Sequence, residues 1–113
     1  MKVQYHLNKM AANMKTIDVN AEQFEQVLYL ACATATAEDV QQLRLSSKVL
    51  DKLEAKSLEK PDGQGFKLMN ETEQFELEDT EAEFVLKRIE EMIPSLQTWA
   101  SRKILPVIDQ LTG

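Results

Sequence analysis

The sequence predicts an α+β fold in which a small antiparallel sheet of three or four strands packs with about four helices. Two patterns predict this fold class. Apolar and polar residues alternate, as they do in half-buried strands, over residues 3–7 and 75–78, and residues 16–19 and 66–77 are expected to form further strands. Apolar residues recur at helical spacing in four longer stretches, residues 21–36, 36–58, 80–93 and 95–111. The alternative fold is a purely helical bundle.

Capping residues predict where the helices begin. Asn20 with Gln23, and Thr80 with Glu83, have the spacing of a capping box, in which side chains accept hydrogen bonds from free backbone amides at a helix start. Thr36 is the expected cap of the second helix, because acidic residues follow it in the first turn. Each expected strand of the central region therefore leads into a helix.

Prolines and glycines predict where the chain changes direction. Pro94 should end or restart the third helix, and Pro106 should kink the last helix or begin a new short one. A proline and two of the three glycines fall in a linker at about residues 57–66. After this linker, a hairpin that turns at residues 69–72 is favoured over one long strand.

The sequence also contains a candidate internal repeat. Residues 17–53 align with residues 75–111 without a gap at an offset of 58 residues, which lays Val27 on Val85, for example. Each repeat would be a strand followed by two helices, and the two would share one core about a pseudo-twofold axis in a single domain of residues 1–113. The alternative is chance, because any two such segments can be slid into some register.

Composition disfavours several classes of function. The 113 residues carry a net charge of −6, so no basic field attracts nucleic acid or an anionic membrane, and neither is an expected partner. No apolar run approaches the ~20 residues that span a bilayer. Cys32 is the only cysteine, which excludes an intrachain disulfide and favours a reducing compartment, so we expect a cytoplasmic protein.

Few residues are suited to catalysis or to holding a cofactor. Cys32 lies in an alanine-rich apolar helix, where a small core side chain is a better interpretation than a nucleophile. His6, the single histidine, is expected on the polar side of the first strand. The sequence contains no phosphate-binding loop and no HExxH, CxxC or EF-hand motif. We therefore expect no enzymatic activity, no cofactor and no metal.

Seven carboxylates crowd the transition from the strand that ends at Leu77 to the helix that begins at Thr80, with no basic residue among them: Glu71, Glu73, Glu76, Glu78, Asp79, Glu81 and Glu83. Three interpretations compete. They form a solvated acidic edge that prevents edge-to-edge pairing of strands. They form a contact surface for a basic partner, including one that normally binds nucleic acid, because dense carboxylates imitate a row of phosphates. They form a divalent-cation site, although the glycine-punctuated loop of dedicated calcium sites is missing.

Trp99 is the single tryptophan of the chain. Burial in the core is the favoured interpretation of this residue. The alternative is an anchor in a partner or dimer interface.

These observations lead to the hypothesis of a small non-enzymatic protein-binding module that contacts a basic protein through the seven carboxylates and Trp99. In character alone, such a short acidic chain resembles many small phage or mobile-element proteins, and the resemblance implies an inhibitor or an anti-defence or regulatory protein. The alternative is a homo-oligomeric structural or assembly factor that associates through Trp99 and residues 104–111. A third hypothesis is a small enzyme or ligand-binding protein that uses carboxylates with His6.

Overall fold

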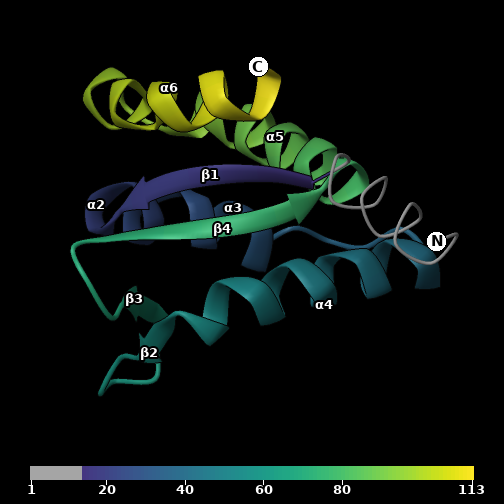
Figure 1. The fold of residues 1–113 in the computed structure, drawn as a ribbon, viewed down its shortest axis with the longest axis horizontal. Helices are drawn as coiled ribbons and strands as arrows, with labels where there is room; N and C mark the ends of the chain where they lie inside the picture. The colour runs from purple at the N-terminus through teal and green to yellow at the C-terminus, as the bar shows by residue number, and fades with distance from the viewer. Residues whose placement is uncertain (1–13) are drawn as a thin grey trace, which may run out of the picture.

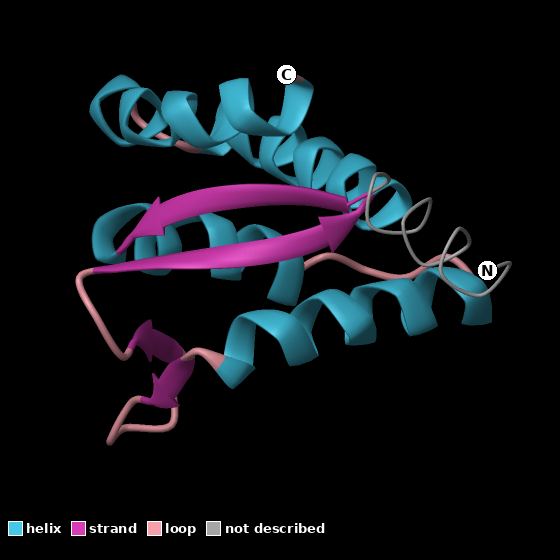
Figure 2. Cartoon of the chain, in the orientation of Figure 1, coloured by secondary structure: helices cyan, strands magenta, loops and turns pink. Residues whose placement is uncertain are grey.

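A computed structural model describes residues 14–113, and its fold is α+β, as the sequence predicts. Figure 2 shows a long strand pair and a short one packed with helices. α2, η1 and α3 form one continuous helix whose middle turn has π geometry. The elements in chain order are β1 (Met14–Asn20), α2 (Ala21–Gln23), η1 (Phe24–Leu28), α3 (Tyr29–Ala33), α4 (Val40–Ala55), β2 (Ser57–Glu59), β3 (Phe66–Leu68), β4 (Thr72–Glu78), α5 (Asp79–Met92), η2 (Ile93–Ser95) and α6 (Thr98–Thr112).

The described strands form two antiparallel pairs rather than one sheet of three or four strands. β1 pairs with β4 along its whole length, with Ile17 opposite Phe75, and β2 pairs with β3. The predicted hairpin at residues 69–72 is wrong, because the strands on either side of it, β3 and β4, pair with different partners. The predicted strand at residues 3–7 lies outside the described residues.

Alternation places the apolar side chains of the β1–β4 pair on one face. Ile17, Val19, Phe75 and Leu77 are at most 1% exposed, and burying a side chain of this size contributes roughly 1.5–3 kcal/mol. The helix of residues 21–33 lies behind the strands in Figure 1, and these side chains join one core cluster with it and with the other helices. The alternate side chains of both strands are exposed, so the opposite face of the pair is open to solvent.

Two helices cover the outer edges of the β1–β4 pair with side chains instead of further strands (Figure 1). α4 lies beside β4, where Lys52 Nζ donates to the backbone oxygen of Glu76 at 2.9 Å. α6 lies beside β1, where the Gln110 amide donates to the backbone oxygen of Asp18 at 3.0 Å and accepts from its backbone nitrogen at 2.6 Å. Several of the backbone groups that a two-stranded sheet would leave unpaired therefore have side-chain partners.

Both strands of the pair lead directly into a capped helix. Asn20 and Gln23 form the predicted capping box, with each side chain accepting from the backbone nitrogen of the other at 2.8 and 2.9 Å. The predicted box at Thr80 is wrong, because the capping box lies two residues earlier, where Glu78 is the cap and Glu81 accepts from its backbone nitrogen at 2.8 Å. The apolar periodicity indicated the helix but not the turn at which it begins.

The other boundaries differ from the prediction by a few residues. The carboxylate of Asp39, not Thr36, caps α4, and α4 ends at Ala55 rather than at about residue 58. α5 ends just before Pro94, as predicted, and the proline lies in the 3-10 turn η2. Pro106 lies inside α6, which continues through it, so no new short helix begins there.

The predicted linker at residues 57–66 is ordered as β2, a loop and the start of β3. Gly63 and Gly65 have φ angles of 71° and 124°, in a region that side chains disfavour, so the loop depends on glycine at both positions. Phe66 packs against Tyr29 with ring centroids 5.4 Å apart. This contact fastens the β2–β3 hairpin to the first helix.

The element bounds recur at the same offset of 58 residues that aligns the sequence. A shift of 58 lays β1 on β4, and it lays residues 21–33 on α5 and α4 on α6 to within one residue. Val27 and Val85 correspond, and both are 0% exposed. The side-chain hydrogen bonds to the strand edges, which we call edge bonds, also correspond at this offset: Lys52 donates to the backbone of β4, and Gln110 donates to the backbone of β1. The second helix of each half contacts the strand of the other half, so the two halves are interleaved.

Candidate functional site

The predicted contact carboxylates separate into two groups in space. Glu71 and Glu73 lie at the beginning of β4, whereas the others lie at its end and in the first two turns of α5. A strand advances about 3.3 Å per residue, which puts Glu71 roughly 20 Å from Glu78. Glu73 is half-buried and accepts from the side-chain amide of Asn70 at 2.6 Å. The second group is the larger and the more exposed of the two.

Glu81 does not belong to the surface, so its predicted role as a contact residue is wrong. Its side chain is almost fully buried, and Oε1 accepts from Lys52 Nζ at 2.6 Å and from the backbone nitrogen of Glu78 at 2.8 Å. A carboxylate shielded from water in this way requires such partners. Glu81 is the third residue of α5, as Gln23 is the third residue of the first helix. This position is typical of a capping box, and it could have indicated the structural role of Glu81 from the sequence.

Asp18 is an exposed carboxylate that the sequence did not assign to the cluster. The register of the strand pair places it opposite Gln74 and therefore diagonal to Glu76, on the same open face. Its alternation within β1 predicted an outward side chain, but only the pairing of β1 with β4 brings it beside the other acids. We call the following five exposed residues the acidic surface: Asp18, Glu76, Glu78, Asp79 and Glu83.

No member of the acidic surface forms an ion pair with a base among residues 14–113. The four ion pairs in this range are Lys52 with Glu81, Lys60 with Glu25, Arg88 with Glu91, and Lys103 with Glu22. Three lysines do lie close by, but their ammonium groups also bind backbone oxygens: Lys15 that of Leu111, Lys52 that of Glu76, and Lys56 that of Gln74. The acidic surface thus contains more carboxylates than ammonium groups.

A hollow of about 290 Å³ lies at one end of the acidic surface. Asp79 and Glu83 line it, one turn apart on α5 and hence on one side of the helix. Its other lining residues are Lys15, Ala82, Leu86 and Leu111. Two carboxylates beside an apolar floor suit the hydrocarbon stem and charged end of a lysine or arginine side chain.

Trp99 is 56% exposed, so the favoured interpretation of a core residue is wrong. Its Nε1 donates to Gln97 Oε1 at 2.5 Å, and Lys103 Nζ lies 5.2 Å from the ring centroid. The indole lines a hollow of about 480 Å³ together with Leu30 and Leu96. Trp99 lies on the outer side of α6, whereas Ala100, Ile104, Val107 and Leu111 of the same helix are buried.

Three apolar side chains of residues 104–111, the expected association surface of the alternative hypothesis, face inward. Ile104 and Val107 are 0% exposed and Leu111 is 3% exposed. Leu105 is the large apolar side chain of this stretch that reaches solvent, at 50% exposed. Trp99 and Leu105 are therefore the large apolar side chains of that predicted surface that are exposed and available for contact.

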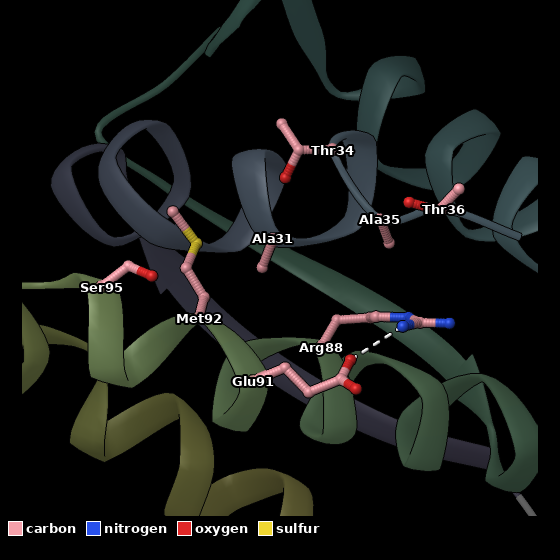
Figure 3. A pocket seen from close by; sticks show the side chains of 8 residues that line it. All are labelled: Ala31, Thr34, Ala35, Thr36, Arg88, Glu91, Met92 and Ser95. Carbon is pink, nitrogen blue, oxygen red and sulfur yellow. Dashed lines mark hydrogen bonds and ion pairs between the residues drawn. The ribbon is translucent and has the colours of Figure 1, made fainter.

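A third hollow, of about 310 Å³, lies between α3 and the end of α5. Figure 3 shows Ala31 and Ala35 facing Arg88 across it, with the Arg88 guanidinium bonded to Glu91 at 2.8 Å. The guanidinium also lies 5.0 Å from the ring centroid of Phe84. The Arg88 guanidinium is thus held within the fold by Glu91 and by the ring of Phe84, and this hollow is not a continuation of the acidic surface.

The groups considered for catalysis are not brought together in the described part of the chain. Burial raises the pKa of the Cys32 thiol from 9.0 to about 12, against a smaller lowering by Arg88, so the thiol is neutral at ordinary pH. His6 lies outside the described residues. No group of three or more histidine, cysteine, aspartate or glutamate side chains in residues 14–113 is arranged to hold a metal.

Comparison with known protein families, with curated proteins and with solved structures finds no match to this chain. Among the helices of residues 14–113, none has the length and apolar character needed to cross a membrane.

Proposed function

We propose that the chain is a small non-enzymatic protein-binding module whose acidic surface binds a basic surface of a partner protein. The observation that carries this proposal is the exposure of five carboxylates, three on the open face of the β1–β4 pair and two at the start of α5, with no ion pair to a described base. Protection against edge-to-edge pairing of strands does not explain these carboxylates, because α4 and α6 already cover both edges of the β1–β4 pair.

The hollow between Asp79 and Glu83 defines the chemistry of the partner more closely. A lysine or arginine can place its stem on Leu86 and its charge between the two carboxylates. Carboxylates that continue along β4 then meet further basic side chains. Because such a row imitates phosphates, the partner class includes proteins that bind nucleic acid, and the module would act as their inhibitor or regulator.

Charge reversal on the acidic surface tests the proposal. The variant E76K/E83K changes two exposed side chains for which no hydrogen bond to a described residue is found, and it leaves the Glu81 capping box intact. Proteins that co-purify with the wild type from the source cells at low salt, and are released at high salt, should be lost from this variant. Mass spectrometry of both samples identifies them.

E38K/E90K is the matched control, because it makes the same change in net charge at two exposed acids outside the acidic surface. The proposal expects E38K/E90K to retain the partners. Equal loss from both variants would mean that only net charge matters, and retention by E76K/E83K would mean that the acidic surface is not the contact. Either result removes the proposal.

We also propose that residues 14–56 and 72–113 are two copies of one strand-helix-helix unit, related by a pseudo-twofold axis between Ile17 and Phe75. Three facts support it: the element bounds recur at an offset of 58 residues, the two residues at that offset face each other in the ladder, and the edge bonds of Lys52 and Gln110 correspond. A chance alignment of helical periods would match apolar positions, but not caps and edge bonds.

A homo-oligomeric assembly factor is the second candidate function. The exposed Trp99, next to Leu30 and Leu96 at a hollow of about 480 Å³, favours it, since tryptophan is enriched in interfaces. Light scattering over a range of concentrations should then show an oligomer in the wild type that W99A reduces to a monomer. A wild type that stays monomeric at all concentrations removes this candidate.

A further inference from the structure

We infer that two copies of this chain exchange halves, so that residues 14–56 of one copy pair with residues 72–113 of the other. The partner is a second copy of the chain, and the contact is the interface that already joins the two halves within one copy. The inference depends on the interleaving of the halves and not on the acidic surface.

The interface between the halves is extensive and continuous. It contains the seven-residue β1–β4 ladder, the contact of α4 with β4 and the contact of α6 with β1. Buried residues of both halves, such as Val27 and Val85, belong to one core cluster. Neither half can cover its own apolar side chains, so a half that opens must close again on an equivalent half.

The two halves are joined at one place only. The β2–β3 hairpin stays with the first half, because Phe66 packs on Tyr29 and the backbone nitrogen of Met69 donates to the oxygen of Lys56 at 3.2 Å. The chain then turns toward β4 over the exposed residues 69–71. Exchange therefore requires a new backbone direction in this short segment and no new kind of contact.

A second copy fits this interface better than any other partner does. Every contact in an exchanged dimer is already present in the monomer, including the edge bonds of Lys52 and Gln110. The free-energy difference is limited to the entropy of association and the strain at residues 69–71. Refolding at high concentration should therefore favour the dimer.

Two single-cysteine substitutions in the full chain report exchange directly. Asp18 and Gln74 are opposite each other on the open face. The Asp18 backbone groups bond outward to Gln110, so this is a non-hydrogen-bonded pair, whose Cα separation of about 4.5 Å permits a disulfide. D18C and Q74C chains are unfolded together under reducing conditions, refolded as a mixture and then oxidised.

An exchanged dimer yields a covalent D18C–Q74C species of twice the monomer mass, and its yield rises with the protein concentration during refolding. A mixture of D18C with E90C is the matched control, because Glu90 is exposed on α5 and, among the described strands, β1 pairs only with β4. It should give no such species. The wild type treated alone controls for Cys32, which is buried.

A variant without residues 69 and 70 supplies a second measurement, since a shorter turn hinders the return of β4 to β1 of the same copy. Light scattering should show its mass doubled relative to the wild type. If the D18C and Q74C mixture gives no more covalent dimer than the control at any refolding concentration, the inference is overturned. A folded monomer in the shortened variant would also overturn it.

Discussion

Glu81 and Gln23 occupy the same place in the two halves, the third residue of a helix that follows a strand of the long pair. Both complete a capping box. Gln23 also donates from Nε2 to the backbone oxygen of Lys103 at 2.8 Å, whereas Glu81 accepts from Lys52 Nζ at 2.6 Å. Each therefore bonds to the second helix of the other half, one through a neutral amide and the other through a charge.

This comparison predicts an asymmetric cost of changing the Lys52–Glu81 pair. K52Q leaves the carboxylate of Glu81 buried without its cation and should destabilise the fold by about 2 kcal/mol, less than the ~3–5 kcal/mol of fully buried pairs because Lys52 is partly exposed. E81Q copies Gln23, keeps the capping box and should cost about 1 kcal/mol or less. Urea unfolding of both variants measures the difference.

The double variant K52Q/E81Q is the internal control of this prediction. It places two neutral amides where the pair was, so it should be more stable than K52Q alone. Equal costs for the two single variants, or costs that add in the double variant, would show that the burial of the carboxylate is not what the lysine compensates.

Burial of a single residue was the hardest property to predict from the sequence. Glu81 and Glu83 differ by two positions in an acidic run, yet one is buried and the other exposed, because they lie on different sides of α5, whose cap is two residues earlier than predicted. Trp99 was expected in the core for its size, but it lies in the first turn of α6, where its side chain remains exposed. The exact start of a helix decides such cases, and sequence patterns fix it only to within a turn.

At the scale of the element, the β1–β4 pair is unusual in having helical side chains along both edges. An isolated two-stranded sheet is marginal in water. Here Gln110 accepts from and donates to the backbone of Asp18, and Lys52 donates to the backbone of Glu76. Within residues 14–113, helices rather than further strands therefore lie along both edges of the pair.

Removal of one of these edge contacts should be measurable. Q110A breaks both hydrogen bonds to Asp18 and should lower the free energy of unfolding by about 1 kcal/mol, because the groups it frees are partly exposed. Hydrogen exchange of the Asp18 backbone amide should also become faster. Q41A, at an exposed position of α4, is the control and should change neither value; unchanged exchange at Asp18 in Q110A would show that the edge does not depend on the glutamine.

The elements themselves were largely predictable because their patterns are local. Period-two alternation indicated β1 and β4, and the Asn20 box marked the start of the first helix. The pairing of strands was not predictable in the same way. The sequence after the linker predicts one hairpin, but β3 pairs with β2 and β4 pairs with β1. Local alternation does not indicate which strands pair.

At the scale of the whole molecule, the two halves are interleaved, so a substitution in one half affects the packing of both. α4 belongs to the first half in sequence but lies against the strand of the second, and α6 does the reverse. A change in either half therefore alters packing in both. The acidic surface shares this property, because Asp18 comes from one half and the other four acids from the other.

Leu53 and Leu111 test whether the molecule unfolds as one unit. They correspond at the offset of 58 residues, near the ends of α4 and α6, and are 1% and 3% exposed. L53A and L111A should each lower the free energy of unfolding by about 2–5 kcal/mol, the range for a buried leucine truncated to alanine. Both should show a single transition with an unchanged dependence on denaturant.

The fluorescence of Trp99 reports the unfolding of the second half separately, because Trp99 is the single tryptophan and lies in that half. If the halves unfold together, L53A in the first half must shift the Trp99 fluorescence transition as far as it shifts the circular dichroism of the whole chain. L105A, at a side chain that is 50% exposed, should shift both by less than about 0.5 kcal/mol and serves as the control. A fluorescence transition that stays in place while the circular dichroism of L53A moves would mean that the second half is stable without the first, which the contacts of α4 with β4 and of α6 with β1 do not allow.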